Sequence, residues 1–122
     1  MPGNVVHVEL PAGDTTRSRD FWGGLFGWQW QAMEGPFEYH MTQIDDKSGA
    51  AVFPADGDAR GLRAYFDVDD INAGISRVNE LGGEAGEAQP VPGMGWFTMA
   101  KDTEGNQFGL WQTDPSAPAP GQ

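Results

Sequence analysis

Residues 7–27 read HVELPAGDTTRSRDFWGGLFG, and a stretch of the same design, RAYFDVDDINAGISRVNELGG, occupies residues 63–83, an offset of 63 − 7 = 56 positions. Each stretch opens with residues that alternate as in a strand and continues into a helix that starts at Asp14 or Asp70, a residue type favoured at helix N-caps. Leu25 and Gly27 correspond to Leu81 and Gly83. The sequence therefore contains two copies of one supersecondary unit.

The remainder of each unit has room for three short strands separated by turn residues. In the first unit we expect strands near 28–33, 37–45 and 49–54, and in the second near 84–90, 95–101 and 107–112. The sequence thus predicts an α+β fold of two tandem βαβββ modules. A ferredoxin-like βαββαβ sandwich also repeats a strand–helix–strand unit, but it has no place for the extra strands.

These patterns predict one domain over residues 1–113. The first module covers about residues 4–54, a linker follows at 55–61, and the second module covers about 62–113. Residues 114–122 are small, polar or proline, a composition typical of a disordered tail.

The composition excludes several classes of protein. Among 122 residues there is no Cys, so a disulfide framework and Cys-based metal sites are excluded. The 7 Lys and Arg face 18 Asp and Glu, a formal charge of −11, which argues against nucleic acid or a membrane surface as a partner. The N-terminus has no signal-peptide pattern, so we expect a cytoplasmic protein. A neutral or cationic small molecule suits this acidic chain best.

Four motifs carry a resemblance to a known group. They are the HVEL strand at His7–Leu10, FWGGLFGW at Phe21–Trp28, FDVDDI at Phe66–Ile71 and DTEGN at Asp102–Asn106. In this order and spacing they resemble the vicinal oxygen chelate superfamily, which includes the glyoxalases, extradiol dioxygenases and bleomycin-resistance proteins. The resemblance implies a curled sheet around a cavity, helices on the outside, and a homodimer.

In the metalloenzymes of that superfamily, two His and one or two carboxylates from the first and last strands of each unit bind a divalent ion. The positions carried over to this chain hold His7, Arg63, Gly109 and, 56 residues before Gly109, Phe53. Only His7 has a lone pair to offer a metal. We therefore expect no cofactor, with a divalent Zn, Ni, Mn or Fe ion as the alternative.

Strand alternation places a set of polar and aromatic side chains on the cavity face. His7 and Tyr65 are the candidates for catalytic acid–base or oxyanion roles, and the candidates for ligand binding on this face are Glu9, Arg63, Asp67, Gln107, Gly109 and Trp111. The alternative is that these charged groups only pair with each other in a partly buried network.

The five Trp residues divide between two roles. Trp22 is expected to pack on the first helix. Trp28, Trp30, Trp96 and Trp111 are candidates for a wall on which an aromatic ligand stacks, where Gly109 leaves room. Ordinary core or dimer contacts are the alternative for these four rings.

The favoured hypothesis is metal-independent binding of a small aromatic, neutral or cationic compound, as in the bleomycin-resistance group. One alternative is a metal-dependent lyase, isomerase or dioxygenase of the glyoxalase type. The other is a domain whose aromatic face binds another protein.

Overall fold

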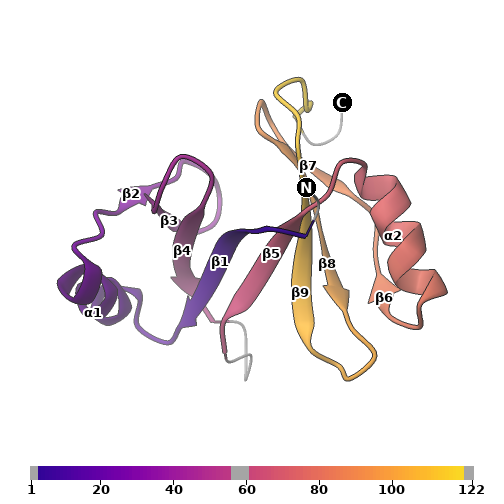
Figure 1. Ribbon diagram of the computed structural model, residues 1–122. Helices are drawn as coiled ribbons and strands as arrows, with labels where there is room; N and C mark the ends of the chain where they lie inside the picture. The colour runs from indigo at the N-terminus through magenta and orange to yellow at the C-terminus, as the bar shows by residue number, and fades with distance from the viewer. Residues whose placement is uncertain (1–2, 56–60, 120–122) are drawn as a thin grey trace. The chain divides into compact units, whose positions relative to one another are not determined.

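The computed structural model describes residues 3–55 and 61–119 (Figure 1). The chain forms two compact units, one of residues His7–Arg63 and one of Met1–Val6 with Ala64–Gln122. Residues 3 and 4 belong with the second unit. The Gly3 N–H donates to the Asp67 carbonyl at 2.8 Å, and the Asp67 N–H donates to the Asn4 carbonyl at 3.0 Å. Most of the expected linker, residues 56–60, lies outside the described residues.

The His7–Arg63 unit follows the predicted βαβββ order. Its elements are β1 (Val5–Ala12), α1 (Thr15–Phe26), β2 (Gln31–Ala32), β3 (His40–Gln43) and β4 (Gly49–Pro54). The strands lie in the order β2-β3-β4-β1, with β4 parallel to β1 and antiparallel to β3.

The other unit repeats this arrangement with β5 (Arg63–Asp67), α2 (Ile71–Glu80), β6 (Glu84–Ala85), β7 (Gln89–Val91), β8 (Gly95–Lys101) and β9 (Gln107–Thr113). The strands lie in the order β5-β9-β8-β6, and β7 also pairs with β8. As in the first unit, the first and last strands along the chain, β5 and β9, pair in parallel, and the hairpin β8–β9 is antiparallel. The predicted α+β fold of two such modules is confirmed.

Both helices begin at the expected caps. The Asp14 carboxylate accepts from the Arg17 N–H at 3.0 Å, and the Asp70 carboxylate accepts from the Asn72 N–H at 3.0 Å. Helix α1 ends at Gly27, whose φ of 74° is the left-handed conformation that glycine adopts at low cost.

The core of the His7–Arg63 unit lies between the sheet and α1. Leu10, Ala50 and Val52 are buried, and the partly buried residues that pack against them are Val8, Ala12, Trp22, Trp28 and Trp30. Even-numbered residues of β1 therefore face the helix. The odd-numbered His7 and Glu9 lie on the opposite face of the strand.

Three predicted strands differ in extent from those observed. The strands expected at 28–33 and 37–45 shorten to β2 and β3, because Trp28 and Trp30 turn toward α1 and the Trp30 indole N–H donates to the Arg19 carbonyl at 3.2 Å. The strand expected at 84–90 is divided by residues 86–88 into β6 and β7. Within the described parts of the chain, no helix is long and apolar enough to cross a membrane.

The segment expected to be a disordered tail makes defined contacts over residues 114–119. The Trp96 indole N–H donates to Asp114 at 3.0 Å, the Gly93 N–H donates to the Ala117 carbonyl at 3.0 Å, and Ala117 is buried. The segment therefore has intramolecular partners at Asp114 and Ala117. Residues 120–122 lie outside the described residues.

Candidate functional site

A chain of hydrogen bonds crosses the face of β1 opposite α1. The Tyr39 hydroxyl donates to Oε2 of Glu9 at 2.9 Å, and Nε2 of His7 lies 2.9 Å from the same hydroxyl oxygen. A phenol has one hydrogen, and here Glu9 receives it, so Nε2 of His7 acts as the donor to Tyr39. This fixes the His7 tautomer with its proton on Nε2.

Arg63 extends this network on the same face. Its Nη1 lies 4.0 Å from Oε1 of Glu9, and its guanidinium carbon lies 5.7 Å from the centre of the Phe53 ring. Tyr39 also packs against Phe53, with ring centres 5.9 Å apart. The pairing of Arg63 with Glu9, expected from the sequence, thus occurs, and a cation lies against an aromatic face.

Burial controls the protonation of His7. Loss of water around the imidazole lowers its pKa from 6.5 to about 4, because a buried charge is poorly solvated. At neutral pH the ring is uncharged. His7, Glu9, Tyr39 and Arg63 therefore present one neutral donor ring, one carboxylate, one phenol and one guanidinium on a single surface, which we name the β1 polar face.

On the β5–β9 face of the other unit, the Tyr65 ring packs directly against Gly109. A Cβ on Gly109 would lie 2.3 Å from Cδ2 of Tyr65, so the Tyr65 ring occupies the space that a side chain at 109 would need. Tyr65 is 7% exposed, and its hydroxyl donates to the Met99 sulfur at 3.1 Å. Gly109 does make room, but Tyr65 of the same chain fills it.

The remaining candidates on this face have structural contacts. The Trp111 ring covers Gly95, where an added Cβ would lie 2.6 Å from Cζ2 of Trp111, and its indole N–H donates to the Thr113 hydroxyl at 3.0 Å. The Asp67 carboxylate accepts from the Asn4 N–H at 2.9 Å. Gln107 is exposed at the start of β9.

Three of the four Trp candidates lie away from these faces. Trp28 stacks on Trp22 with ring centres 6.0 Å apart and meets Trp30 edge to face, on the α1 side of β1. Trp96 pairs in register with Gln112, on the face of β8 opposite the one that Met99 shares with Gly109. The structure places Trp28 and Trp30 in core packing, the alternative that the sequence also allowed.

Comparison with known proteins identifies the family. Residues 6–111 match the model of the glyoxalase-like domain. The chain belongs to the glyoxalase-like domain family. This glyoxalase-like protein is 30% identical to a glyoxylase-like domain-containing protein of Didymella fabae, over 90% of this chain and 94% of that one.

A second relative is longer. The anthracycline biosynthesis protein DnrV of Streptomyces peucetius is 30% identical over 91% of this chain and 47% of its own length. The glyoxalase-like chain thus spans about half the length of that relative and of several others.

Among solved structures, a methylmalonyl-CoA epimerase in complex with methylmalonyl-CoA and NH4+ superposes with a TM-score of 0.74, over 98% of this chain and all of that one. The identity is 13%, so the likeness concerns the fold. The predicted relationship to the glyoxalases is confirmed by the domain match over residues 6–111.

The positions that the resemblance assigns to metal ligands hold His7, Arg63 and Gly109 in this glyoxalase-like protein. His7 is bonded to Tyr39, Arg63 is a cation, and Tyr65 covers Gly109. Glu9 pairs with Ala51 as Tyr65 pairs with Gly109, so the counterpart of Gly109 in the first unit is Ala51 and not Phe53. The match to Phe53 was wrong because the offset at the last strand is 109 − 51 = 58 residues.

Alanine offers no more to a metal than Phe53 does. Within the described residues, no group of three or more His, Cys, Asp or Glu side chains is arranged to hold an ion.

Sequence reasoning missed Tyr39, which joins His7 to Glu9. Tyr39 lies inside the strand expected at 37–45, but it was not singled out as a candidate, and in the structure it is half-buried just before β3 begins at His40. Its neighbour His40 was correctly placed on a middle strand. The His40 ring lies 2.7 Å from Glu38, whose pKa is lowered by hydrogen bonds from Thr15 and His40.

Proposed function

We propose that this glyoxalase-like protein binds a small aromatic compound on the β1 polar face without a metal ion. The observation that carries the proposal is the network itself. At the positions where the family's metalloenzymes hold a divalent ion, this chain has His7 bonded to a phenol and Arg63 paired with a carboxylate. Such groups recognise ligand oxygens by hydrogen bonds instead of by chelation.

The charges of the β1 polar face indicate which class of ligand it can bind. Glu9 and Arg63 carry opposite charges, and His7 is neutral because burial lowers its pKa to about 4. The face has no net charge, which favours a neutral ligand over the cationic one that the acidic composition first suggested. A carbonyl or hydroxyl oxygen on an aromatic ring would accept from Arg63 while the ring packs on Phe53.

The relatives are compatible with this class. The name of the Streptomyces peucetius relative places it in anthracycline biosynthesis, and anthracyclines are planar polycyclic compounds that carry carbonyl and hydroxyl groups. A binding protein for an oxygenated aromatic compound would suit such a setting.

The direct test is calorimetric titration of a panel of hydroxylated naphthoquinones and anthraquinones into metal-free protein. We expect binding that weakens about tenfold in Arg63→Met, since charge-assisted hydrogen bonds contribute about 1.5–3 kcal/mol. Arg17→Met, which removes an exposed cation of α1, is the matched control. Absence of binding across the panel, or equal loss in both variants, would contradict the proposal.

A second titration, in which Zn, Ni, Mn or Fe ions are added to the metal-free protein, distinguishes metal-independent binding from a metal-dependent lyase, isomerase or dioxygenase. We expect no stoichiometric binding of these ions. A tight one-to-one isotherm that is abolished in His7→Ala would overturn metal independence.

We also propose that the protein is a homodimer. The support is the exposed apolar surface of α1, where Phe21 is 61% and Leu25 is 57% exposed. Sedimentation equilibrium should give the mass of a dimer, and Phe21→Ser with Leu25→Ser should shift it toward monomer while Asp20→Ser leaves it unchanged. A monomeric parent protein would refute this part.

A further inference from the structure

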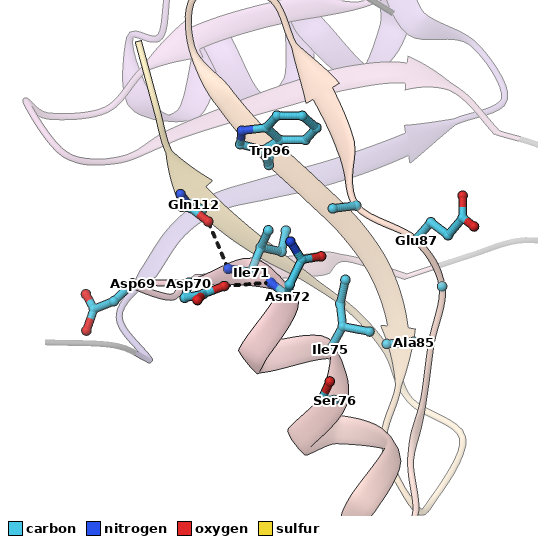
Figure 2. A pocket seen from close by; sticks show the side chains of 12 residues that line it. Asp69, Asp70, Ile71, Asn72, Ile75, Ser76, Ala85, Glu87, Trp96 and Gln112 are labelled. Carbon is cyan, nitrogen blue, oxygen red and sulfur yellow. Dashed lines mark hydrogen bonds between the residues drawn. The ribbon is translucent and has the colours of Figure 1, made fainter. Parts of the chain in front are cut away.

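A cleft of about 940 Å³ lies in the unit of residues 1–6 and 64–122 (Figure 2). One wall is the N-terminal part of α2, and the other is the segment between β6 and β7. Trp96 of β8 and Gln112 of β9 complete it. The break at residues 86–88, where a continuous strand was expected, therefore forms part of its boundary.

The start of α2 does not offer its N–H groups to a ligand. The Ile71 N–H donates to the Gln112 side-chain oxygen at 2.8 Å, and the Asn72 and Ala73 N–H groups donate to Asp70 at 3.0 and 3.1 Å (Figure 2). Free N–H groups at a helix start attract anions, and here the three donors have intramolecular acceptors. An anionic ligand would gain little at this position.

The formal charges around the cleft are all negative. Asp69, Asp70 and Glu87 line it, and the residues that the structure places in its lining include no Lys or Arg. All three carboxylate residues are exposed, so they attract cations from solvent without being locked in ion pairs with the described residues.

Trp96 supplies an aromatic surface in the same cleft. Its indole N–H donates to Asp114 at 3.0 Å, which holds the ring while its face contributes to the cleft (Figure 2). Ile75 and Ala88 add apolar lining. An aromatic face attracts ammonium groups electrostatically, and Trp does so most strongly among the aromatic residues.

We propose that the α2 cleft, defined by Ile71, Ile75, Glu87, Ala88, Trp96 and Gln112, binds an organic ammonium ion with an apolar or aromatic body. The ammonium group lies against Trp96 and the body covers Ile75 and Ala88, while the acidic residues of the lining attract the cation from solvent. This site uses none of the residues of the β1 polar face. The proposal can therefore be confirmed or contradicted independently of the function proposed above.

The test compares three probes of equal size and different charge. Phenylethylammonium, 2-phenylethanol and phenylacetate are titrated into 15N-labelled protein, and the Trp96 indole N–H and the Ile75 and Ala88 amide signals are followed. We expect the ammonium probe to shift these signals and to bind at least about fivefold more tightly than the alcohol, as a cation–π contact predicts. Phenylacetate should bind most weakly.

Two matched variants locate the interaction. Glu87→Gln should weaken the binding of the ammonium probe about threefold, because the variant loses one attractive charge near an exposed cation. Glu84→Gln removes an exposed carboxylate from the same segment outside the cleft and should leave the affinity unchanged. Equal binding of the three probes, no shift of the Trp96 signal, or equal losses in both variants would overturn the proposal.

Discussion

Burial of the His7 imidazole makes the stability of the protein depend on pH. The pKa of His7 is about 4 in the folded chain and about 6.5 when exposed, so between these values the unfolded state binds the extra proton. The contribution is complete above pH 6.5 and is lost as the pH falls toward 4. Urea denaturation should show a loss on the order of 3 kcal/mol across this window.

In His7→Gln this part of the pH dependence should disappear, and the His7 ring signals of the parent protein should titrate near pH 4 in NMR spectra. A His7 midpoint near 6.5, or an unchanged pH profile in His7→Gln, would show that the ring is not buried as the structure has it.

The Tyr39 hydroxyl joins His7 to Glu9, so its contribution to the free energy of unfolding can be measured. Tyr39→Phe removes the donor to Glu9, which is 8% exposed, and the acceptor for His7. A buried carboxylate that loses a hydrogen bond costs about 1–3 kcal/mol, and we expect that loss in urea denaturation at pH 7. A variant as stable as the parent would place the Tyr39 hydroxyl outside the network.

Much of this network follows from the sequence, because alternation along a strand places His7 and Glu9 on one face without further information. Tyr39 was not found in this way: it lies in the strand expected at 37–45, but the observed β3 begins only at His40 and the contact of Tyr39 with Glu9 is a tertiary one. The role of Gly109 could be predicted only in part. An absent side chain shows that space is needed, but which ring fills that space depends on pairing of β5 with β9, which brings Tyr65 opposite Gly109.

At the scale of elements, the packing of α1 can be tested with two adjacent glycines. A Cβ on Gly23 would lie 3.0 Å from the Trp28 carbonyl oxygen, whereas a Cβ on Gly24 would meet nothing within 4 Å. Alanine stabilises a helix interior by roughly 0.5–1 kcal/mol relative to glycine where there is space. Gly24→Ala should therefore raise Tm, and Gly23→Ala should lower it.

Differential scanning calorimetry provides this comparison, and helix propensity cancels between the two variants. Equal increases in Tm would mean that residues 28–30 do not pack on α1.

The C-terminal segment is a second element with a testable role. A chain that ends at Thr113 loses the bonds from Trp96 to Asp114 and from Gly93 to Ala117, and exposes the surface under Ala117. We expect a loss of about 1–2 kcal/mol in thermal or urea denaturation. A chain that ends at Ala119 keeps these bonds and serves as the control; equal stability of the two would contradict the role.

The elements show where sequence reasoning succeeds and fails. Caps at Asp14 and Asp70 and the strands at 49–54 and 95–101 depend on local residue types, and they occur as predicted. The segments at 28–33 and 114–119 depend on distant partners, namely α1 for Trp30 and Trp96 for Asp114. Tertiary contacts determine the conformation of such segments, and the local sequence pattern contains no information about those contacts.

For the whole molecule, the formal charge is −11, and few of the acidic side chains in the described residues form ion pairs. Across residues 3–55 and 61–119 only two ion pairs come within 4.0 Å, His40 with Glu38 and Arg63 with Glu9. Most of the 18 acidic side chains therefore repel each other through solvent, and this repulsion opposes the compact state. Salt should reduce that penalty, because the screening length falls to about 8–10 Å near physiological ionic strength.

Raising NaCl from about 20 to about 200 mM should thus increase the stability by on the order of 1 kcal/mol and raise Tm by a few degrees. The matched variant Glu34→Lys with Glu80→Lys changes two exposed positions and brings the formal charge to −11 + 4 = −7. It should be more stable than the parent at low salt and respond less to added NaCl. If both proteins respond equally, or if salt lowers the parent's Tm, the net charge does not limit the stability of the fold and the acidic surface is energetically neutral.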